Sequence, residues 1–224
     1  MEEVQLNINF KRIVSRADRT KLESPLEEFF IHHLEKYISH QTVIIPQYKV
    51  KTVTGNFRLD FVLQIGERKI GIECDGKDFH HEWHDELRDA MILGGGAVDT
   101  IYRFRGKDIH TFIDDCIYII YFYDKDLFND RYHILAEQLA SQDIRMSLKD
   151  DSYSARERNM FLYEKVNQDS GEQVGWLELL VERRDKKVGG HWQTLYSFAV
   201  KHPEATTIAD LAALREKGNP FIKH

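Results

Sequence analysis

The chain has 224 residues, of which 42% are hydrophobic and 12% aromatic, so it can bury a substantial core and is too apolar for wholesale disorder. Its formal net charge of −6 excludes nucleic-acid binding through overall positive charge and leaves only local basic patches for that purpose. The two cysteines, Cys74 and Cys116, are too few for a disulfide scaffold or a cysteine zinc site, and they suit a reducing compartment.

The N-terminal stretch alternates apolar and polar residues over Val4–Ile13, which predicts a strand or an extended arm within residues 1–23. It lacks the apolar centre of a signal peptide. The longest apolar run, Cys116–Phe122, is far too short to cross a bilayer. We therefore expect a cytoplasmic protein with no membrane partner.

A strong helix signal begins at Ser24. Ser24 is a favoured N-cap, Pro25 suits the first helical position, and Glu27 stands where an acid completes a capping box. The apolar residues that follow recur at helical spacing as far as Ile38. The pattern predicts an amphipathic helix with one face in the core.

Three segments rich in β-forming residues come next: Thr42–Val50, Phe57–Ile65 and Lys69–Asp75. Pro46, in the first of them, indicates an edge strand or a bulge. The second and third are joined by a tight turn at Gly66, so we expect them to form an antiparallel hairpin.

Further elements alternate after this hairpin. Trp83–Leu93 has a helical period and is stopped by three glycines. Ala97–Arg105 predicts a strand, Asp108–Tyr123 an apolar helix, and Leu127–Ala140 a connecting helix. The resulting order of helix, three strands, helix, strand and helix predicts an α/β fold in which helices flank a central mixed sheet.

The predicted elements divide the chain into three parts. The arm of residues 1–23 is followed by a core with trailing helices over residues 24–148. A polar linker at Lys149–Arg158 then introduces a small α+β appendage over residues 149–224, whose role the sequence does not reveal. Within it we expect two hairpin strands and two helices: Met160–Val166, Val174–Arg184, Trp192–Val200 and Ile208–Lys217.

The most informative stretch is the strand that ends at Asp75. Glu73 and Asp75 are two residues apart, so both project from the same face of the strand. Asp60, flanked by apolar residues on the preceding strand, can reach the same place across the hairpin. Carboxylates that leave a core need a partner, and a divalent cation such as Mg²⁺ is one. The alternatives are solvated acids at a strand end, or an Asp60 that pairs with a nearby basic residue.

Five pieces of sequence, in this order, carry a resemblance to a known family: SPLE (Ser24–Glu27), RLDFVL (Arg58–Leu63), IGIECDGKDFH (Ile70–His80), HDELRD (His84–Asp89) and IYRFRGKDI (Ile101–Ile109). The chain resembles the PD-(D/E)XK nuclease superfamily, and within it the branch around the very-short-patch-repair endonuclease and its restriction-endonuclease-like relatives. The resemblance covers residues 24–110. It implies a restriction-endonuclease-like core, a Mg²⁺-dependent endonuclease activity on DNA, and Mn²⁺ as a substitute cofactor.

The resemblance also implies roles for individual acids. Asp60 and Glu73 match the metal-binding acids of the family, and Cys74 would offer its backbone carbonyl. Asp75 stands where many members have lysine, although an acid followed by glycine is common in this branch, so it is a third candidate metal ligand or a group that orients water. Glu27 matches the helix glutamate that can contact the metal through water.

Two nearby residues are candidates for the group that stabilises charge or moves a proton, namely Lys77 and His80. For contacts with DNA phosphates, the resemblance and the basic character of the following elements indicate four residues: Arg88, Arg103, Arg105 and Lys107.

Each of these residues also has a plainer interpretation. Glu27 can simply complete the capping box. The histidines near His80 can lie in a surface loop, Arg88 can form helix salt bridges, and Arg103 and Arg105 can solvate a sheet edge. Cys74 is interpreted as an inert strand residue.

Three hypotheses follow for the function. The first is a metal-dependent DNA endonuclease of a restriction, repair or defence type, which could act as a homodimer. The second is a nuclease fold that has lost catalysis and binds nucleic acid or protein, for which the C-terminal region offers a surface. The third is a zinc enzyme that uses His80, His81 and His84, although these lack the usual spacing of zinc ligands on a helix.

Overall fold

The structure, a computed structural model, describes residues 16–76, 82–150, 156–167 and 169–218, and in helices at two of these boundaries the side chains of residues 82, 83 and 216–218 are not described. The expected strand or arm at Val4–Ile13 lies outside the described residues. So do two of the candidate catalytic residues, Lys77 and His80.

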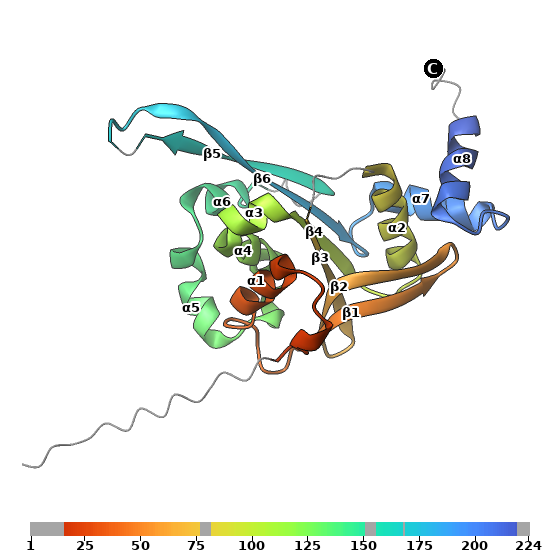
Figure 1. The fold of residues 1–224 in the computed structure, drawn as a ribbon, viewed down its shortest axis with the longest axis horizontal. Helices are drawn as coiled ribbons and strands as arrows, with labels where there is room; N and C mark the ends of the chain where they lie inside the picture. The colour runs from red at the N-terminus through yellow and green to blue at the C-terminus, as the bar shows by residue number, and fades with distance from the viewer. Residues whose placement is uncertain (1–15, 77–81, 151–155, 168, 219–224) are drawn as a thin grey trace, which may run out of the picture.

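A six-stranded mixed sheet forms the centre of the molecule, with helices on both of its faces, as the sequence predicts (Figure 1). The strands lie in the order β1-β2-β3-β4-β6-β5. Their bounds are Val43–Thr52 (β1), Gly55–Ile65 (β2), Arg68–Asp75 (β3), Thr100–Arg105 (β4), Arg158–Val166 (β5) and Gln173–Asp185 (β6).

The first three strands form an antiparallel meander whose turns use glycine. Gly55 and Gly66 both have positive φ, 133° and 56°, which a residue with a Cβ rarely adopts. The chain then crosses over through helix α2 (Glu82–Gly94), so that β4 pairs with β3 in parallel and Glu73 lies beside Arg103. Helix α2 begins and ends close to its predicted bounds.

One face of the sheet is covered by the first helix of the chain and by the helices that lie between β4 and β5. The buried core on this side includes Phe30, Phe61, Phe104 and Ile117. Its helices are α1 (Pro25–Leu34), α3 (Gly106–Thr111), α4 (Ile113–Tyr123), α5 (Asp130–Leu139) and α6 (Gln142–Ser147), with short 3-10 turns at Arg19–Lys21 (η1) and Lys125–Leu127 (η2).

Helix α2 covers the opposite face, and α7 (His191–Lys201) and α8 (Ile208–Gly218) pack against α2. A second buried cluster, including Val62, Leu87 and Ile101, joins α2 to the sheet. The candidate carboxylates of β3 lie on this second side, because Arg88 of α2 contacts Glu73.

Three helices differ from their predicted bounds. The helical spacing predicted after Ser24 runs to Ile38, but α1 ends at Leu34. The expected helix over Asp108–Tyr123 is broken at Phe112, whose φ of −130° and ψ of 39° are not helical and whose ring stacks on Tyr163 at 4.3 Å between centroids. The expected helix over Leu127–Ala140 starts only at Asp130, because Asn129 caps it by accepting a hydrogen bond from the Tyr132 N–H.

The C-terminal region is more closely joined to the core than the sequence suggests. Its hairpin forms as expected, but β6 also pairs with β4, from Thr100 opposite Asp185 to Phe104 opposite Val181. The expected appendage is thus in part a continuation of the central sheet, and the far end of the β5–β6 hairpin extends beyond the body (Figure 1).

In the part of the chain that the structure describes, no helix combines the length and apolarity needed to cross a membrane.

The close packing of α7 on α2 predicts an effect of mutation. A Cβ at Gly94 would lie 2.2 Å from the ring of Tyr196, so Gly94→Ala should lower the free energy of unfolding by about 1–3 kcal/mol. The matched control is Gly189→Ala, whose Cβ meets only the flexible end of Gln193. Denaturant titration of both variants checks this, and equal stabilities would contradict the packing described.

Candidate functional site

Asp60 and Glu73 are brought together by the pairing of β2 with β3. The regular register of these strands ends at Phe61 opposite Ile72. Beyond it the Cys74 N–H donates a hydrogen bond to Asp60 Oδ2 at 2.8 Å, so a side chain takes the position of a backbone acceptor. The carboxyl of Asp60 is therefore fixed against the strand that carries Glu73, close enough for each acid to affect the pKa of the other.

Burial makes these acids hard to ionise. It raises the pKa of Glu73 to about 8, opposed by the charge of Arg88 and reinforced by that of Asp60. Burial likewise raises the pKa of Asp60. The hydrogen bond from the Cys74 N–H lowers this pKa, and the charge of Glu27 raises it further. For Asp75, burial raises the pKa to about 6 although Arg103 and Arg88 oppose it. In this acidic corner, formed by Asp60, Glu73 and Asp75, the nearby arginines only partly offset the effect of burial on the pKa values of the acids.

The donor set fits Mg²⁺ better than a structural metal held by a full cage of protein ligands. Among the described residues, no group of three or more histidine, cysteine or acidic side chains converges as a metal cage. Asp60 and Glu73 alone supply two carboxylates, and Mg²⁺ commonly takes one or two carboxylates and keeps its remaining positions for water and phosphate. A cation between them would also lower the raised pKa values of both acids.

Glu27 forms the capping box and also faces the acidic corner. Its N–H donates to Ser24 Oγ at 3.2 Å, and its carboxylate accepts from the Ser24 hydroxyl at 3.0 Å and from the Glu23 N–H at 3.1 Å. It is buried, 5% exposed, and its charge raises the pKa of Asp60. The plainer interpretation of Glu27 is therefore met, and its side chain remains close enough to act on Asp60.

A residue that sequence reasoning missed lies between these groups. Gln47 has a φ of 53°, the one non-glycine residue with positive φ in the described chain, and it interrupts the pairing of β1 with β2. Its Nε2 donates to Glu27 Oε2 at 2.8 Å, while its Oε1 is buried without a hydrogen-bond partner in the described part of the molecule. The preceding Pro46 signals a bulge, but no sequence pattern marks the glutamine itself.

The structure gives acidic partners to all four candidate phosphate-binding residues. Arg88 Nη2 donates to Glu73 Oε1 at 2.5 Å. Arg105 pairs with Asp108 at 2.6 Å, and both Arg105 and Lys107 form ion pairs with Glu178.

Arg103 is only 1% exposed and forms ion pairs with three aspartates: Asp75 at 3.4 Å, Asp85 at 3.3 Å and Asp89 at 3.1 Å. A phosphate contact by Arg103 would first require those ion pairs to open.

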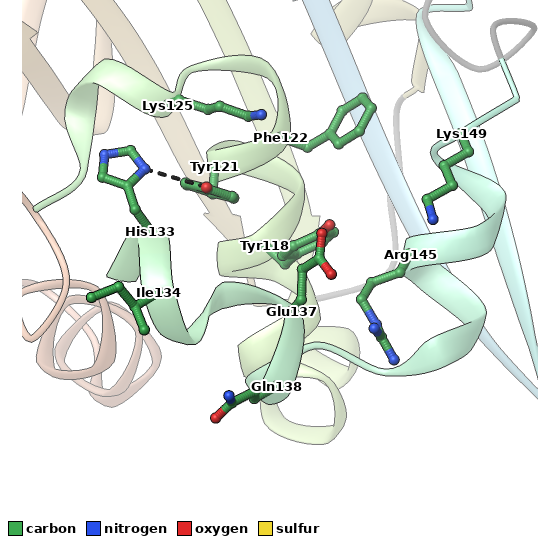
Figure 2. Close-up of a pocket in the computed structure, with 10 residues that line it drawn as sticks. All are labelled: Tyr118, Tyr121, Phe122, Lys125, His133, Ile134, Glu137, Gln138, Arg145 and Lys149. Carbon is green, nitrogen blue, oxygen red and sulfur yellow. Dashed lines mark hydrogen bonds between the residues drawn. The ribbon is translucent and has the colours of Figure 1, made fainter. Parts of the chain in front are cut away.

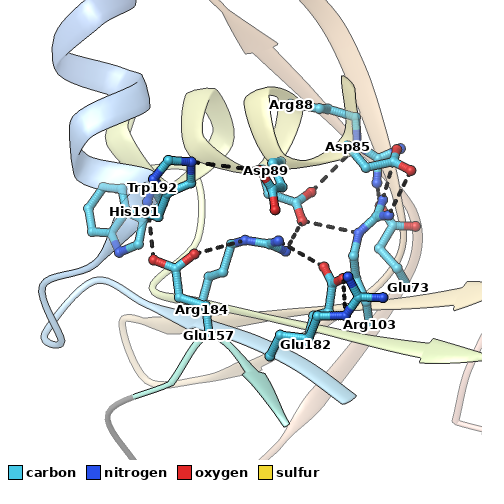
Figure 3. A network of polar contacts seen from close by, with 12 residues as sticks. Glu73, Asp85, Arg88, Asp89, Arg103, Glu157, Glu182, Arg184, His191 and Trp192 are labelled. Carbon is cyan, nitrogen blue, oxygen red and sulfur yellow. Dashed lines mark hydrogen bonds and ion pairs between the residues drawn. The ribbon is translucent and has the colours of Figure 1, made fainter. Parts of the chain in front are cut away.

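Arg103 belongs to a larger buried network that ties the C-terminal strands to α2 (Figure 3). Asp89, fully buried, contacts Arg103 and also accepts from Arg184 Nη1 at 2.8 Å. Arg184 in turn contacts Glu182 at 2.8 Å and Glu157 at 3.4 Å. These partners are separated by up to 95 residues in sequence, so no local pattern could indicate them.

The remaining candidates divide between exposed and buried positions. His84 has an exposed side chain at the start of α2, and the neighbouring His81 lies outside the described residues. Cys74 is buried, and burial raises the pKa of its thiol well above the ordinary value, which agrees with an inert strand residue.

No protein-family model, curated protein or solved structure matches this chain.

The raised pKa values predict how stability depends on pH in the metal-free protein. A carboxyl whose pKa is higher in the folded chain than in the unfolded chain binds its proton more tightly when folded, and so stabilises the fold at low pH. For Glu73, this stabilisation is complete below its unfolded pKa of 4.5. It is lost as the pH rises to its folded pKa of about 8. In EDTA, unfolding free energy should fall by about 2–4 kcal/mol from pH 5 to pH 8. Glu73→Gln should remove most of that slope, whereas an unchanged slope would contradict the assignment.

The buried network predicts a large loss of stability when its central acid is removed. Asp89→Ala leaves Arg103 and Arg184 buried without their shared partner, and should lower the unfolding free energy by about 3–5 kcal/mol. Glu23→Ala is the matched control, since the Glu23–Arg58 pair is about half exposed and is expected to contribute about 1 kcal/mol or less. Similar losses in both variants, measured by denaturant titration, would refute a central role for Asp89.

Proposed function

We propose that this protein is a metal-dependent DNA endonuclease of the PD-(D/E)XK type, similar to the very-short-patch-repair branch. The observation that carries the proposal is the pair of buried carboxyls, Asp60 and Glu73, held side by side on adjacent strands with raised pKa values. Such an arrangement is unfavourable by itself and becomes favourable when a cation occupies it.

The architecture supports the same proposal. Helix α1, the meander β1–β2–β3, helix α2 and the parallel strand β4 follow one another in the order that the resemblance implies. The acids lie near the end of β3, where the chain leaves the sheet. A mixed sheet flanked by helices is a common architecture, so the proposal depends on the acids rather than on the fold.

Asp60 and Glu73 would hold Mg²⁺ or Mn²⁺ together with the carbonyl of Cys74. The cation would supply an activated water and would neutralise charge that develops on the phosphoryl group. Asp75, with a pKa of about 6, is mostly ionised at neutral pH and can accept a proton from or orient a water. Lys77 and His80 follow it directly in the chain and stay candidates for stabilising charge or moving a proton.

Glu27 and Gln47 would complete the acidic corner from the side of α1 and β1. Gln47 holds the Glu27 carboxylate through its amide N–H, and its buried amide oxygen has no hydrogen-bond partner among the described residues. Glu27 would act on a metal-held water rather than bind the metal directly, because the capping box already occupies its carboxylate.

For DNA, the candidate contacts remain Arg88, Arg103, Arg105 and Lys107. Lys107 is the most accessible, with its side chain 54% exposed. The chain is acidic overall, so binding would depend on these local cations and should weaken as salt rises.

A second candidate is an inactive nuclease fold that binds nucleic acid or protein. Two observations favour it: the arginines of the site are already paired with acids, and the described residues include no cage of three metal ligands. In that case the C-terminal region would offer a partner surface, and a homodimer would serve binding rather than cleavage of both strands.

The cleavage assay separates the two candidates. Purified protein should cleave supercoiled plasmid, linear duplex or single-stranded DNA in Mg²⁺ or Mn²⁺ and not in EDTA, because the acids need the cation to work on a phosphodiester. Asp60→Asn and Glu73→Gln should each lower the rate by at least about a hundredfold while preserving the fold.

The control is Asp126→Asn, which changes an exposed acid on η2 by the same chemistry and should leave the rate unaltered. Cleavage that survives Glu73→Gln would refute the proposed site. Absence of cleavage on every substrate, with no effect of Mg²⁺ or Mn²⁺ on stability, would favour the inactive fold.

A further inference from the structure

A separate pocket of about 480 Å³ lies among α4, α5 and α6, on the side of the sheet opposite α2 (Figure 2). It takes its walls from the last turns of α4, from η2, from the outer face of α5 and from the end of α6. Its size falls in the range of small-molecule sites. None of the candidate nuclease residues lines it.

The pocket is locally cationic in a protein that is acidic overall. Lys125, Arg145 and Lys149 line it, against the single carboxylate of Glu137. None of the three cations forms an ion pair with an acid in the described chain, in contrast to the arginines of the carboxylate site. The one hydrogen bond of the Arg145 side chain within the described structure joins its Nε to the Ser141 carbonyl at 3.3 Å, which leaves both Nη groups available.

Aromatic side chains form another part of the wall. Tyr118 and Tyr121 are buried with their edges at the pocket, and the Tyr121 hydroxyl lies 3.2 Å from Nδ1 of His133. Burial and the charge of Glu137 raise the pKa of both phenols, so they stay neutral hydrogen-bonding groups. Phe122, half-buried, and Ile134, 74% exposed, add apolar surface at the rim.

We propose that this pocket binds a nucleoside phosphate group, carried either by a free mononucleotide or by the phosphorylated end of a nucleic-acid strand. Arg145 and Lys149 suit the phosphate, and Lys125, whose Nζ lies over the Tyr121 ring at 5.6 Å from its centroid, adds a third cation beside them. The half-buried ring of Phe122 suits the flat face of a base, the buried Tyr121 presents only its edge beside it, and Glu137 can accept hydrogen bonds from sugar hydroxyls or a base amino group. The proposal does not depend on nuclease activity, because it uses none of the same residues.

Calorimetric titration at low salt with adenosine 5′-monophosphate tests the proposal. The buffer contains EDTA, so that no cation in the carboxylate site attracts the phosphate of the probe. We expect saturable binding with a dissociation constant below about 1 mM. Arg145→Gln/Lys149→Gln should weaken it at least about tenfold, because two charge-assisted contacts are lost.

The matched control is Lys49→Gln/Lys51→Gln, which removes the same charge from exposed positions on β1 and should bind like the unaltered protein. Lys125→Gln is a second test variant, and melting temperatures verify that each variant is folded. Equal affinity in the Arg145/Lys149 variant, or no binding by any nucleotide, would overturn the proposal.

Two further probes distinguish the sources of the ligand. A 5′-phosphorylated oligonucleotide that binds more tightly than its unphosphorylated form and than the mononucleotide would assign the pocket to strand ends, whereas tighter binding of the mononucleotide would assign it to free nucleotides. Inorganic phosphate that binds as tightly as the mononucleotide would contradict the role of the aromatic wall.

Discussion

The guanidinium group of Arg103, buried in the middle of the sheet, is the charge on which the placement of the surrounding acids depends. A buried cation is stable only with close partners, and Arg103 finds them in Asp75 at the end of β3 and in Asp85 and Asp89 on α2. Asp89 extends the same network to Arg184 on β6. One set of charges therefore holds the helix of the crossover against the sheet and binds the C-terminal strands to the core.

This network leaves the acids of β2 and β3 incompletely neutralised. Arg88 is the direct ionic partner of Glu73, and Asp60 is held by a backbone N–H rather than by a cation. Burial then raises the pKa of both carboxyls, and burial also raises the pKa of Asp75. Raised pKa values of this kind lower the stability of the folded metal-free chain. Functional sites often have such a cost, which selection for stability alone would remove. The electrostatics of the fold and the proposed chemistry thus have the same origin.

The parts of this structure that could be predicted from sequence are those set by local physics. The capping of α1 by Ser24, the glycine turns of the meander and the alternating pattern of the strands act over a few residues, and the acids at Asp60 and Glu73 stand out because apolar neighbours surround them. Non-local contacts could not be predicted. The pairing of β6 with β4 joins segments about 80 residues apart, the break at Phe112 comes from its packing on a distant ring, and the role of Gln47 arises from a backbone conformation that only the assembled sheet imposes.

The most direct test of the central claim, that the pair formed by Asp60 and Glu73 is a cation site, is calorimetry of Mg²⁺ and Mn²⁺ binding near pH 7 in buffers of different ionisation enthalpy. Because the pKa of Glu73 is about 8 without metal, the bound ion must displace a proton, so the measured heat should depend on the buffer and should show the release of up to about one proton per chain. We expect saturable binding of one ion with this proton release, and loss of both in Glu73→Gln. Absence of saturable binding, or binding with the same heat in Glu73→Gln, would contradict it.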